Sequence, residues 1–268
     1  MKDILRELLA EAAPGVDPRN IVREYLQARV LESMQRLGAL AALAFHGGTA
    51  LRFLYRTPRY SEDLDFALLE GSTAFGLRDT MTRVGNDLRA EAYAVEMGVR
   101  DAGPVHSAKV AFPGLPAELG LSTRPEEKLV IKVDVDTNPP VGATTEISIV
   151  RRFVTLRLQH HDRASLLAGK VNAILTRGWI KGRDVYDLVW YLADPEWPSP
   201  NLTLLNNALE QFGYPAGPLA EATWRAAVQS RLAEADMADV IADVSPFLER
   251  VEDRELLSRE NLELLLKP

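Results

Sequence analysis

Two aspartates separated by one residue are the side chains of this sequence best suited to hold a cation. Asp63 and Asp65 lie in a segment, residues 63–68, whose alternating polar and apolar side chains are typical of a β-strand. Residues i and i+2 of a strand point to the same side, about 6–7 Å apart. Two such carboxylates repel each other unless a cation lies between them, and their oxygens favour Mg²⁺ or Mn²⁺. A solvated strand face remains the alternative for this pair.

A third carboxylate comes from a second alternating segment, residues 129–136. Asp134 lies there on the same side as Lys132 and Asp136, with apolar residues on the other side. If this strand neighbours the first one, Asp134 would complete a two-metal site. The alternative is that these charges simply line the open face of an antiparallel sheet.

A glycine pair precedes the aspartates in the chain. Gly47, Gly48 and Thr49 follow a compact apolar run, residues 40–45, and precede an expected helix, residues 50–55. Two glycines let the backbone approach a ligand closely, and the start of a helix presents N–H groups to an anion. The Thr49 hydroxyl adds a further donor or a helix cap. An ordinary turn is the alternative.

The order of these features resembles the nucleotidyltransferase superfamily with the DNA polymerase β-like fold. More specifically, the chain is similar to the AbiEii/AbiGii-type nucleotidyltransferase toxins of bacterial toxin–antitoxin and abortive-infection systems. The segments that carry this similarity are Phe45–Arg52, Arg59–Phe66, Lys170–Ala173 and Arg183–Leu188, with Arg177 before the last. Thr49 departs from the serine that the wider superfamily often has, although the hydroxyl is retained.

The resemblance implies a role for each matching residue. Asp63, Asp65 and Asp134 would hold Mg²⁺ or Mn²⁺ against the phosphates of an NTP substrate, with Asp134 alternatively the base near the acceptor hydroxyl. Lys170 would contact the triphosphate. Asp184 or Asp187, one turn apart on a helix, would orient Lys170, Arg183 or the acceptor, with a helix-start acid as the alternative for Asp184. The residues expected to bind the nucleotide are Gly47, Gly48, Thr49, Arg52, Ser61 and Lys170. The residues expected to be catalytic are Asp63, Asp65, Asp134, Lys170, Asp184 and Asp187.

The elements that must position these residues divide the chain into two halves. Strands are expected at 40–45, 63–68, 95–100, 105–112, 129–136 and 154–158, with a helix at 72–93 that Ser72 caps and a loop over 113–125. Helices are expected at 163–177, 183–193, 201–212, 217–235, 237–250 and 257–267. The fold class is therefore α+β: a nucleotidyltransferase core with a mixed or antiparallel sheet flanked by helices, followed by an α-helical C-terminal half. We expect a core domain at 1–160, N-terminal helices included, and a helical domain at 161–268 that completes the active-site cleft.

Composition narrows the function classes. The 268 residues include no cysteine, which excludes thiolate catalysis, cysteine zinc sites and disulfides. The longest apolar run, residues 37–45, is far shorter than the roughly 20 residues of a membrane-spanning helix, and the N-terminus lacks a signal-peptide pattern. We therefore expect a cytoplasmic protein without a membrane partner.

Charge is distributed unevenly along the chain. The net charge of −7 argues against a nucleic-acid partner. Residues 151–183, however, contain eight basic residues and one acidic residue, whereas residues 234–263 contain ten acidic and three basic residues. The basic segment 151–183 is expected to bind an RNA backbone.

These observations lead to one main functional hypothesis. The resemblance implies transfer of a nucleoside monophosphate from an NTP to an RNA acceptor, notably the 3′ end of tRNA, with growth arrest as the outcome. It also implies a neighbouring antitoxin, which need not contact the toxin directly. The alternatives are a nucleotidyltransferase that acts on a small molecule or a protein hydroxyl, and a non-catalytic nucleotide-binding module.

Overall fold

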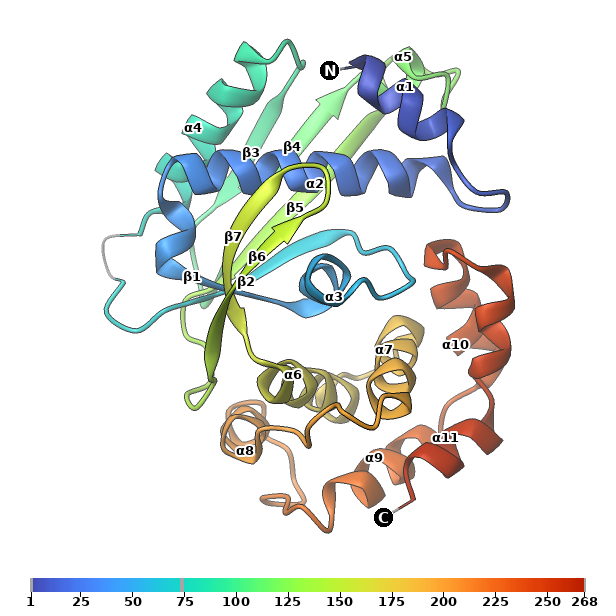
Figure 1. The fold of residues 1–268 in the computed structure, drawn as a ribbon. Helices are drawn as coiled ribbons and strands as arrows, with labels where there is room; N and C mark the ends of the chain where they lie inside the picture. The colour runs from blue at the N-terminus through green and yellow to red at the C-terminus, as the bar shows by residue number, and fades with distance from the viewer. Residues whose placement is uncertain (1, 73–74, 268) are drawn as a thin grey trace. The chain divides into compact units, whose positions relative to one another are not determined.

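A computed structural model describes residues 2–72 and 75–267. The chain forms two compact units, which are described separately. The first unit comprises Met1–Pro139 and Ile147–His160, and the second comprises Pro140–Glu146 and His161–Pro268. Figure 1 shows that the strands precede the helix-rich C-terminal part of the chain.

A mixed sheet forms the framework of the first unit. Its seven described strands are ordered β3-β4-β5-β2-β1-β7-β6. Their bounds are β1 Leu43–His46, β2 Asp63–Leu68, β3 Glu96–Arg100, β4 Val105–Pro113, β5 Lys128–Asp136, β6 Thr145–Arg151 and β7 Thr155–His161. Strand β2 is parallel to β5 and antiparallel to β1, and β4 is antiparallel to both β3 and β5. The expected α+β class with a mixed, helix-flanked sheet is confirmed.

Strand alternation places apolar residues on one face of the sheet. Leu64 and Phe66 of β2 and Ile131 and Val133 of β5 are each at most 1% exposed. Helices α2 (Pro18–Arg36) and α4 (Leu77–Ala90) pack over this side of the sheet, on β5 and on β3 and β4 respectively. The polar residues of the same strands therefore project from the opposite face.

Shorter helices complete the first unit. They are α1 (Lys2–Ala10), the 3₁₀ turn η1 (Ala39–Ala42), α3 (Gly47–Tyr55) and α5 (Leu115–Glu118). Helix α3 follows β1 without a linker and packs on β1 and β2 (Figure 1). The start of α3 is thus fixed relative to the aspartates of β2.

Helices form the second unit. They are α6 (Arg163–Thr176), α7 (Gly182–Ala193), α8 (Leu202–Gln211), α9 (Trp224–Ala233), α10 (Met237–Val244), η2 (Ser245–Phe247), η3 (Val251–Leu256) and α11 (Arg259–Leu265). Asp162 caps α6 by accepting a hydrogen bond from Ser165 N at 2.8 Å. The apolar side chains of α6, α7 and α9 form a buried core around Trp224, which is fully buried.

Several expected boundaries were wrong. Helix α4 begins at Leu77 with Gly76 at its N-cap, so Ser72 does not cap it. Strand β6 and the short helix α5 were not expected, and α9 begins only at Trp224. Helix α3 begins at Gly47 rather than Ala50, which places the glycine pair within its first turn. None of the described helices has the length and apolar character needed to cross a membrane.

Candidate active site

The strand register brings the three expected carboxylates onto one face. In the parallel pairing of β2 with β5, Asp63 lies beside Lys132 and Asp65 lies beside Asp134. All four side chains are partly exposed, while Leu64 between the aspartates is buried. Asp63 and Asp65 therefore project together from the open face of the sheet, as their spacing predicted.

The aspartate pair is electrostatically unfavourable. Burial, and after it the negative charge of Asp65, raises the pKa of Asp63, although Lys132 opposes the shift. The repulsion between the two carboxylates is relieved either by a proton or by a cation that lies between them. This behaviour fits a cation-binding role for Asp63 and Asp65.

Asp134 has direct partners of its own. Its Oδ1 accepts a hydrogen bond of 2.6 Å from Ser107 Oγ, and its Oδ2 forms an ion pair with Lys132 Nζ. This hydrogen bond from Lys132 is the main reason that the pKa of Lys132 is raised. Within residues 2–72 and 75–267, no group of three or more His, Cys, Asp or Glu side chains is placed to hold a metal ion. The third metal ligand therefore remains a prediction, and Ser107 is a partner that the sequence did not indicate.

The glycine pair lies against the carboxylate strand. Gly47 has φ +77°, and a Cβ added to it would lie 2.5 Å from Asp65 Oδ2. A Cβ on Gly48 would lie 2.6 Å from Arg59 Nη2 and 2.8 Å from Ser61 Oγ. The turn can approach these groups only because both residues are glycines. The start of α3 thus lies close to the Asp65 carboxylate, a guanidinium and a hydroxyl.

The first turn of α3 has the features of an anion site. His46, at its N-cap, makes no capping hydrogen bond through its side chain. The N–H groups of a helix start attract phosphate, and Ser61 adds a hydroxyl donor. Arg59 adds a positive charge nearby, although its guanidinium is 3% exposed and donates to the carbonyl of Tyr60 at 2.9 Å. Gly47, Gly48 and Ser61 thus lie together at the start of α3, and their binding of a nucleotide stays a prediction.

Thr49 and Arg52, which were also expected to bind the nucleotide, are buried and bond to neighbouring protein groups. Thr49 is fully buried, and its hydroxyl donates to the backbone carbonyl of Asp63. Arg52 is 2% exposed; its Nε donates to Glu24 at 2.7 Å, Nη1 donates to the carbonyl of Thr57 at 2.8 Å, and its guanidinium lies over the ring of Tyr60. These contacts give both residues a structural role, because their polar groups bind neighbouring protein atoms.

Helix α2 supports the site through buried polar residues that sequence reasoning missed. Gln27 is 1% exposed and its amide donates to the carbonyls of Ser61 and Glu62, at 3.1 and 2.9 Å, just before β2 begins. Glu24 accepts from Arg52 and from Arg152. The spacing of these residues could have revealed their burial. Asn20, Glu24 and Gln27 lie on the same side of the helix as Leu31 and Met34, which are buried.

In the second unit, Lys170 joins two buried carboxylates. Lys170 Nζ lies 2.6 Å from Asp184 Oδ1 and 2.8 Å from Asp187 Oδ2, and the side chains of Asp184 and Asp187 are 7% and 0% exposed. Arg177 also contacts Asp184. The predicted association of Lys170 with the two aspartates thus exists, and it links α6 to α7.

Charge balance in this cluster favours the ionised form of Asp184. Burial opposes the ionisation of Asp184, but the positive charges of Lys170 and Arg177 outweigh it and lower the pKa of this carboxyl. Burial, followed by the charge of Arg183, lowers the pKa of Lys181. The cluster is therefore a desolvated ion-pair network with excess positive charge at its edge.

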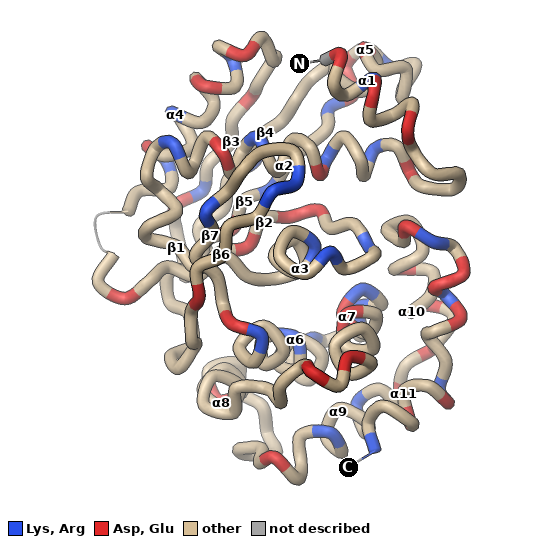
Figure 2. Tube along the Cα trace, in the orientation of Figure 1, with Lys and Arg blue, Asp and Glu red and all other residues tan. Residues whose placement is uncertain are grey.

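The basic segment 151–183 is less available for RNA than its sequence suggests. Figure 2 shows its Lys and Arg residues on the β6–β7 hairpin and on α6 and α7. Four of these residues have carboxylate partners. Arg152 pairs with Glu24, and Arg183 lies near Asp243. Lys170 pairs with Asp184 and Asp187, and Arg177 also pairs with Asp184. Half of its eight basic residues are thus at least partly neutralised within the protein.

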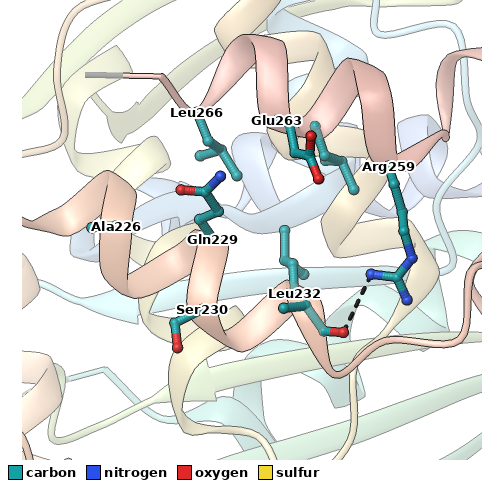
Figure 3. A pocket seen from close by; sticks show the side chains of 9 residues that line it. Ala226, Gln229, Ser230, Leu232, Arg259, Glu263 and Leu266 are labelled. Atoms are coloured by element: carbon teal, nitrogen blue, oxygen red, sulfur yellow. Dashed lines mark hydrogen bonds between the residues drawn. The ribbon is translucent and has the colours of Figure 1, made fainter.

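A pocket of about 380 Å³ lies between α9 and α11 in the second unit (Figure 3). Ala226, Leu232 and Leu266 form part of its apolar wall. The guanidinium of Arg259 donates to the backbone carbonyls of Ala233 and Ala235 and so closes the end of α9. None of the carboxylates predicted to be catalytic lines this pocket.

Comparisons with known proteins give a matching family and a shared fold. The sequence model of the family described as nucleotidyl transferase AbiEii toxin, Type IV TA system, matches residues 29–259. No curated protein matches the chain. Two Helicobacter pylori crystal structures share the fold at 17% sequence identity. One, described as a nucleotidyltransferase, has a TM-score of 0.53 over 94% of this chain and 96% of that chain. The other, JHP933, has a TM-score of 0.54 over 94% and 93%.

Proposed function

Because the chain belongs to the AbiEii family of nucleotidyltransferase toxins of Type IV toxin–antitoxin systems, we propose that it transfers a nucleoside monophosphate from an NTP to RNA. The observation that carries this proposal is the Asp63–Asp65 pair on the open face of the sheet, with Asp65 directly against the Gly47 turn. In the reaction, an acceptor hydroxyl oxygen bonds to the α-phosphorus. The bond from that phosphorus to its bridging oxygen breaks, pyrophosphate leaves and the hydroxyl proton is released.

The nucleotide triphosphate is assigned to the start of α3. There, the main-chain N–H groups of the first helical turn and the Ser61 hydroxyl would bind phosphate oxygens, and the buried Arg59 guanidinium beside Gly48 adds positive charge. Phosphoryl transfer depends mainly on positioning and on neutralising charge, so a rigid turn next to two carboxylates is suited to it. The buried amide of Gln27 contributes by fixing the backbone of Ser61 and Glu62.

Asp63 and Asp65 would hold Mg²⁺ or Mn²⁺. The fit rests on their shared face and on the repulsion between the two carboxylates, which a bound cation relieves. When bound, the ion neutralises phosphate oxygens and stabilises the leaving pyrophosphate. Asp134, which binds Ser107 and Lys132, is assigned a positioning role that holds the Lys132 ammonium beside Asp63.

The acceptor is proposed to be the 3′ end of tRNA, so that translation stops when the modified end can no longer be used. The experiment is to incubate the protein with Mg²⁺, each labelled NTP in turn and an RNA pool that contains tRNA. Labelled RNA is expected with intact 3′ ends, and none is expected with RNA whose terminal diol has been oxidised by periodate. Labelled RNA should also fail to support cell-free translation.

Matched variants connect the activity to the site. Asp63→Asn and Asp65→Asn are expected to lower the rate at least about 100-fold, because each removes a charge that stabilises the transition state by several kcal/mol. Asp79→Asn, on the exposed side of α4, is the control and should label RNA at the normal rate. Labelling of a protein or small molecule instead of RNA would overturn the proposed acceptor, and nucleotide binding without turnover would overturn the proposed activity.

A further inference from the structure

A cavity of about 400 Å³ opens in the first unit beside Asp63. The elements around it are the start of α2, β4, and the N-terminal ends of β2 and β5. Five basic side chains line it together with Asp63: Arg19, Arg23, Lys109, Lys128 and Lys132. The other acidic residues in its wall are Glu62 and Glu127, so positive charge is in excess.

The strand register separates this cavity from the glycine turn. Strands β2 and β5 are parallel, and Asp63 is level with Lys132 while Asp65 is level with Asp134. Lys128 comes before Lys132 along β5, so the cavity lies toward the N-terminal end of this strand pair. The glycine turn contacts Asp65, which lies further toward the C-terminal end. Asp63 thus lies between the turn and the cavity.

The basic side chains of the cavity are only partly neutralised. Arg19 pairs with Glu127 at 3.2 Å, Arg23 with Glu62 at 3.8 Å, and Lys128 with Glu96 at 2.6 Å. Within the described part of the chain, the Lys109 ammonium has no hydrogen bond or ion pair, and the buried Nε of Arg23 has no hydrogen-bond partner. Lys132 pairs with Asp134 as well, and the Nε of Arg23 is buried, so among the described residues of the cavity wall the Lys109 ammonium is the unpaired donor that a second anion can reach.

We propose that this cavity binds a backbone phosphate of the acceptor RNA next to its reacting 3′ hydroxyl. The inference rests on the proposed function, which assigns the NTP triphosphate to the start of α3. The second substrate must then approach Asp63 from the other side, where the cavity lies. Lys and Arg side chains grouped in a cavity favour a phosphate-bearing strand over a neutral hydroxyl of a protein.

Direct binding tests the assignment without catalysis. The probe is a fluorescein-labelled single-stranded RNA of 12 nucleotides, titrated with protein in the absence of NTP at several salt concentrations. Lys109→Gln combined with Lys128→Gln is expected to weaken binding. It should also reduce the slope of log affinity against log salt by about 1.4, since each lost contact with single-stranded RNA contributes about 0.7. Both side chains are exposed, so folding should be retained.

Two controls make the result specific. Arg83→Gln removes an exposed charge from α4, on the other face of the sheet, and should leave affinity and slope unchanged. Lys109→Arg, combined with native Lys128, should keep the affinity because phosphate accepts either cation. Affinity and slope equal to those of the native protein in the double variant would overturn the assignment, as would a native protein that does not bind the RNA.

Kinetics separates this assignment from the proposed function. If both hold, the double variant raises KM for RNA at least about 10-fold and leaves KM for NTP unchanged. RNA binding that depends on Lys109 and Lys128 without any nucleotidyl transfer would refute the proposed function alone. Normal transfer with an unchanged KM for RNA in the double variant would refute the cavity assignment alone.

Discussion

Asp63 carries a stability cost that its proposed role explains. Burial and the neighbouring Asp65 raise its pKa, so the folded protein holds a proton at this carboxyl more tightly than the unfolded chain does. Asp63→Asn is therefore expected to raise the melting temperature of the cation-free protein at neutral pH while it abolishes nucleotidyl transfer. Differential scanning fluorimetry checks the first effect, and the labelling assay checks the second.

The pH dependence of this cost has a defined sign. Because the folded pKa of Asp63 is raised, the native protein loses stability relative to Asp63→Asn as pH rises from the ordinary aspartate range through the raised pKa. At pH values above both the ordinary and the raised pKa of Asp63, the difference in stability between the native protein and Asp63→Asn should be constant. A gap in melting temperature that is largest at acidic pH and closes toward neutral pH would contradict the account.

Lys170 is expected to be as important for stability as for function. Lys170→Met leaves Asp184 and Asp187 buried without their main cation, which costs about 3–5 kcal/mol in comparable buried pairs. Lys170→Arg keeps the charge and should recover part of this loss. Urea denaturation measures both variants, and a Lys170→Met midpoint equal to that of the native protein would show that Arg177 and water suffice.

For single residues, sequence reasoning succeeded where the spacing of two residues alone determines the side of the strand to which their side chains point. Strand alternation was enough to place Asp63 and Asp65 on one face. It could not show that the Thr49 hydroxyl bonds to the carbonyl of Asp63 or that Arg52 pairs with Glu24, since those partners are distant in the chain. The match of Lys170 to a family motif likewise could not indicate how deeply it is buried.

Two helical glycines of the second unit test how closely its elements pack. A Cβ on Gly182, at the start of α7, would lie 2.0 Å from the carbonyl oxygen of Val240 in α10, whereas one on Gly169, within α6, would meet no atom within 4 Å. Gly182→Ala is expected to cost about 1–3 kcal/mol through overpacking. Gly169→Ala should stabilise by roughly 0.5–1 kcal/mol through helix propensity. Thermal denaturation compares them, and equal melting temperatures would refute the close α7–α10 contact.

Element prediction succeeded where the hydrophobic period was regular. Strands β2 and β5 alternate cleanly, and their bounds were placed within one residue. Strand β6 was missed although Ile147 and Ile149 alternate with polar residues in Thr145–Arg151; in the structure none of its side chains is buried, so this strand contributes no core face. The cap of α4 was misjudged as well: the helix begins only at Leu77, and its N-cap Gly76 makes no side-chain hydrogen bond that a sequence pattern could reveal.

At the scale of the whole molecule, each of the two units has its own hydrophobic core. Lys170→Met should therefore lower hydrogen-exchange protection in α6 and α7 while protection in β2 and β5 remains as in the native protein. Exchange followed by mass spectrometry on the full chain tests this. An equal loss of protection in the helices α6 and α7 and in the strands β2 and β5 would show that the chain unfolds as one cooperative unit.

The two end strands of the sheet differ in how they would behave in concentrated solution. Strand β3 carries Glu96 and Arg100 at its edge, whereas β6 presents Ile147 and Ile149, with exposed fractions of 52% and 76%. An open strand edge with apolar side chains is a template for pairing with another chain, and charged residues prevent such pairing. The solubility of this protein at high concentration would then be limited by β6, and Ile149→Lys would be the first change to make.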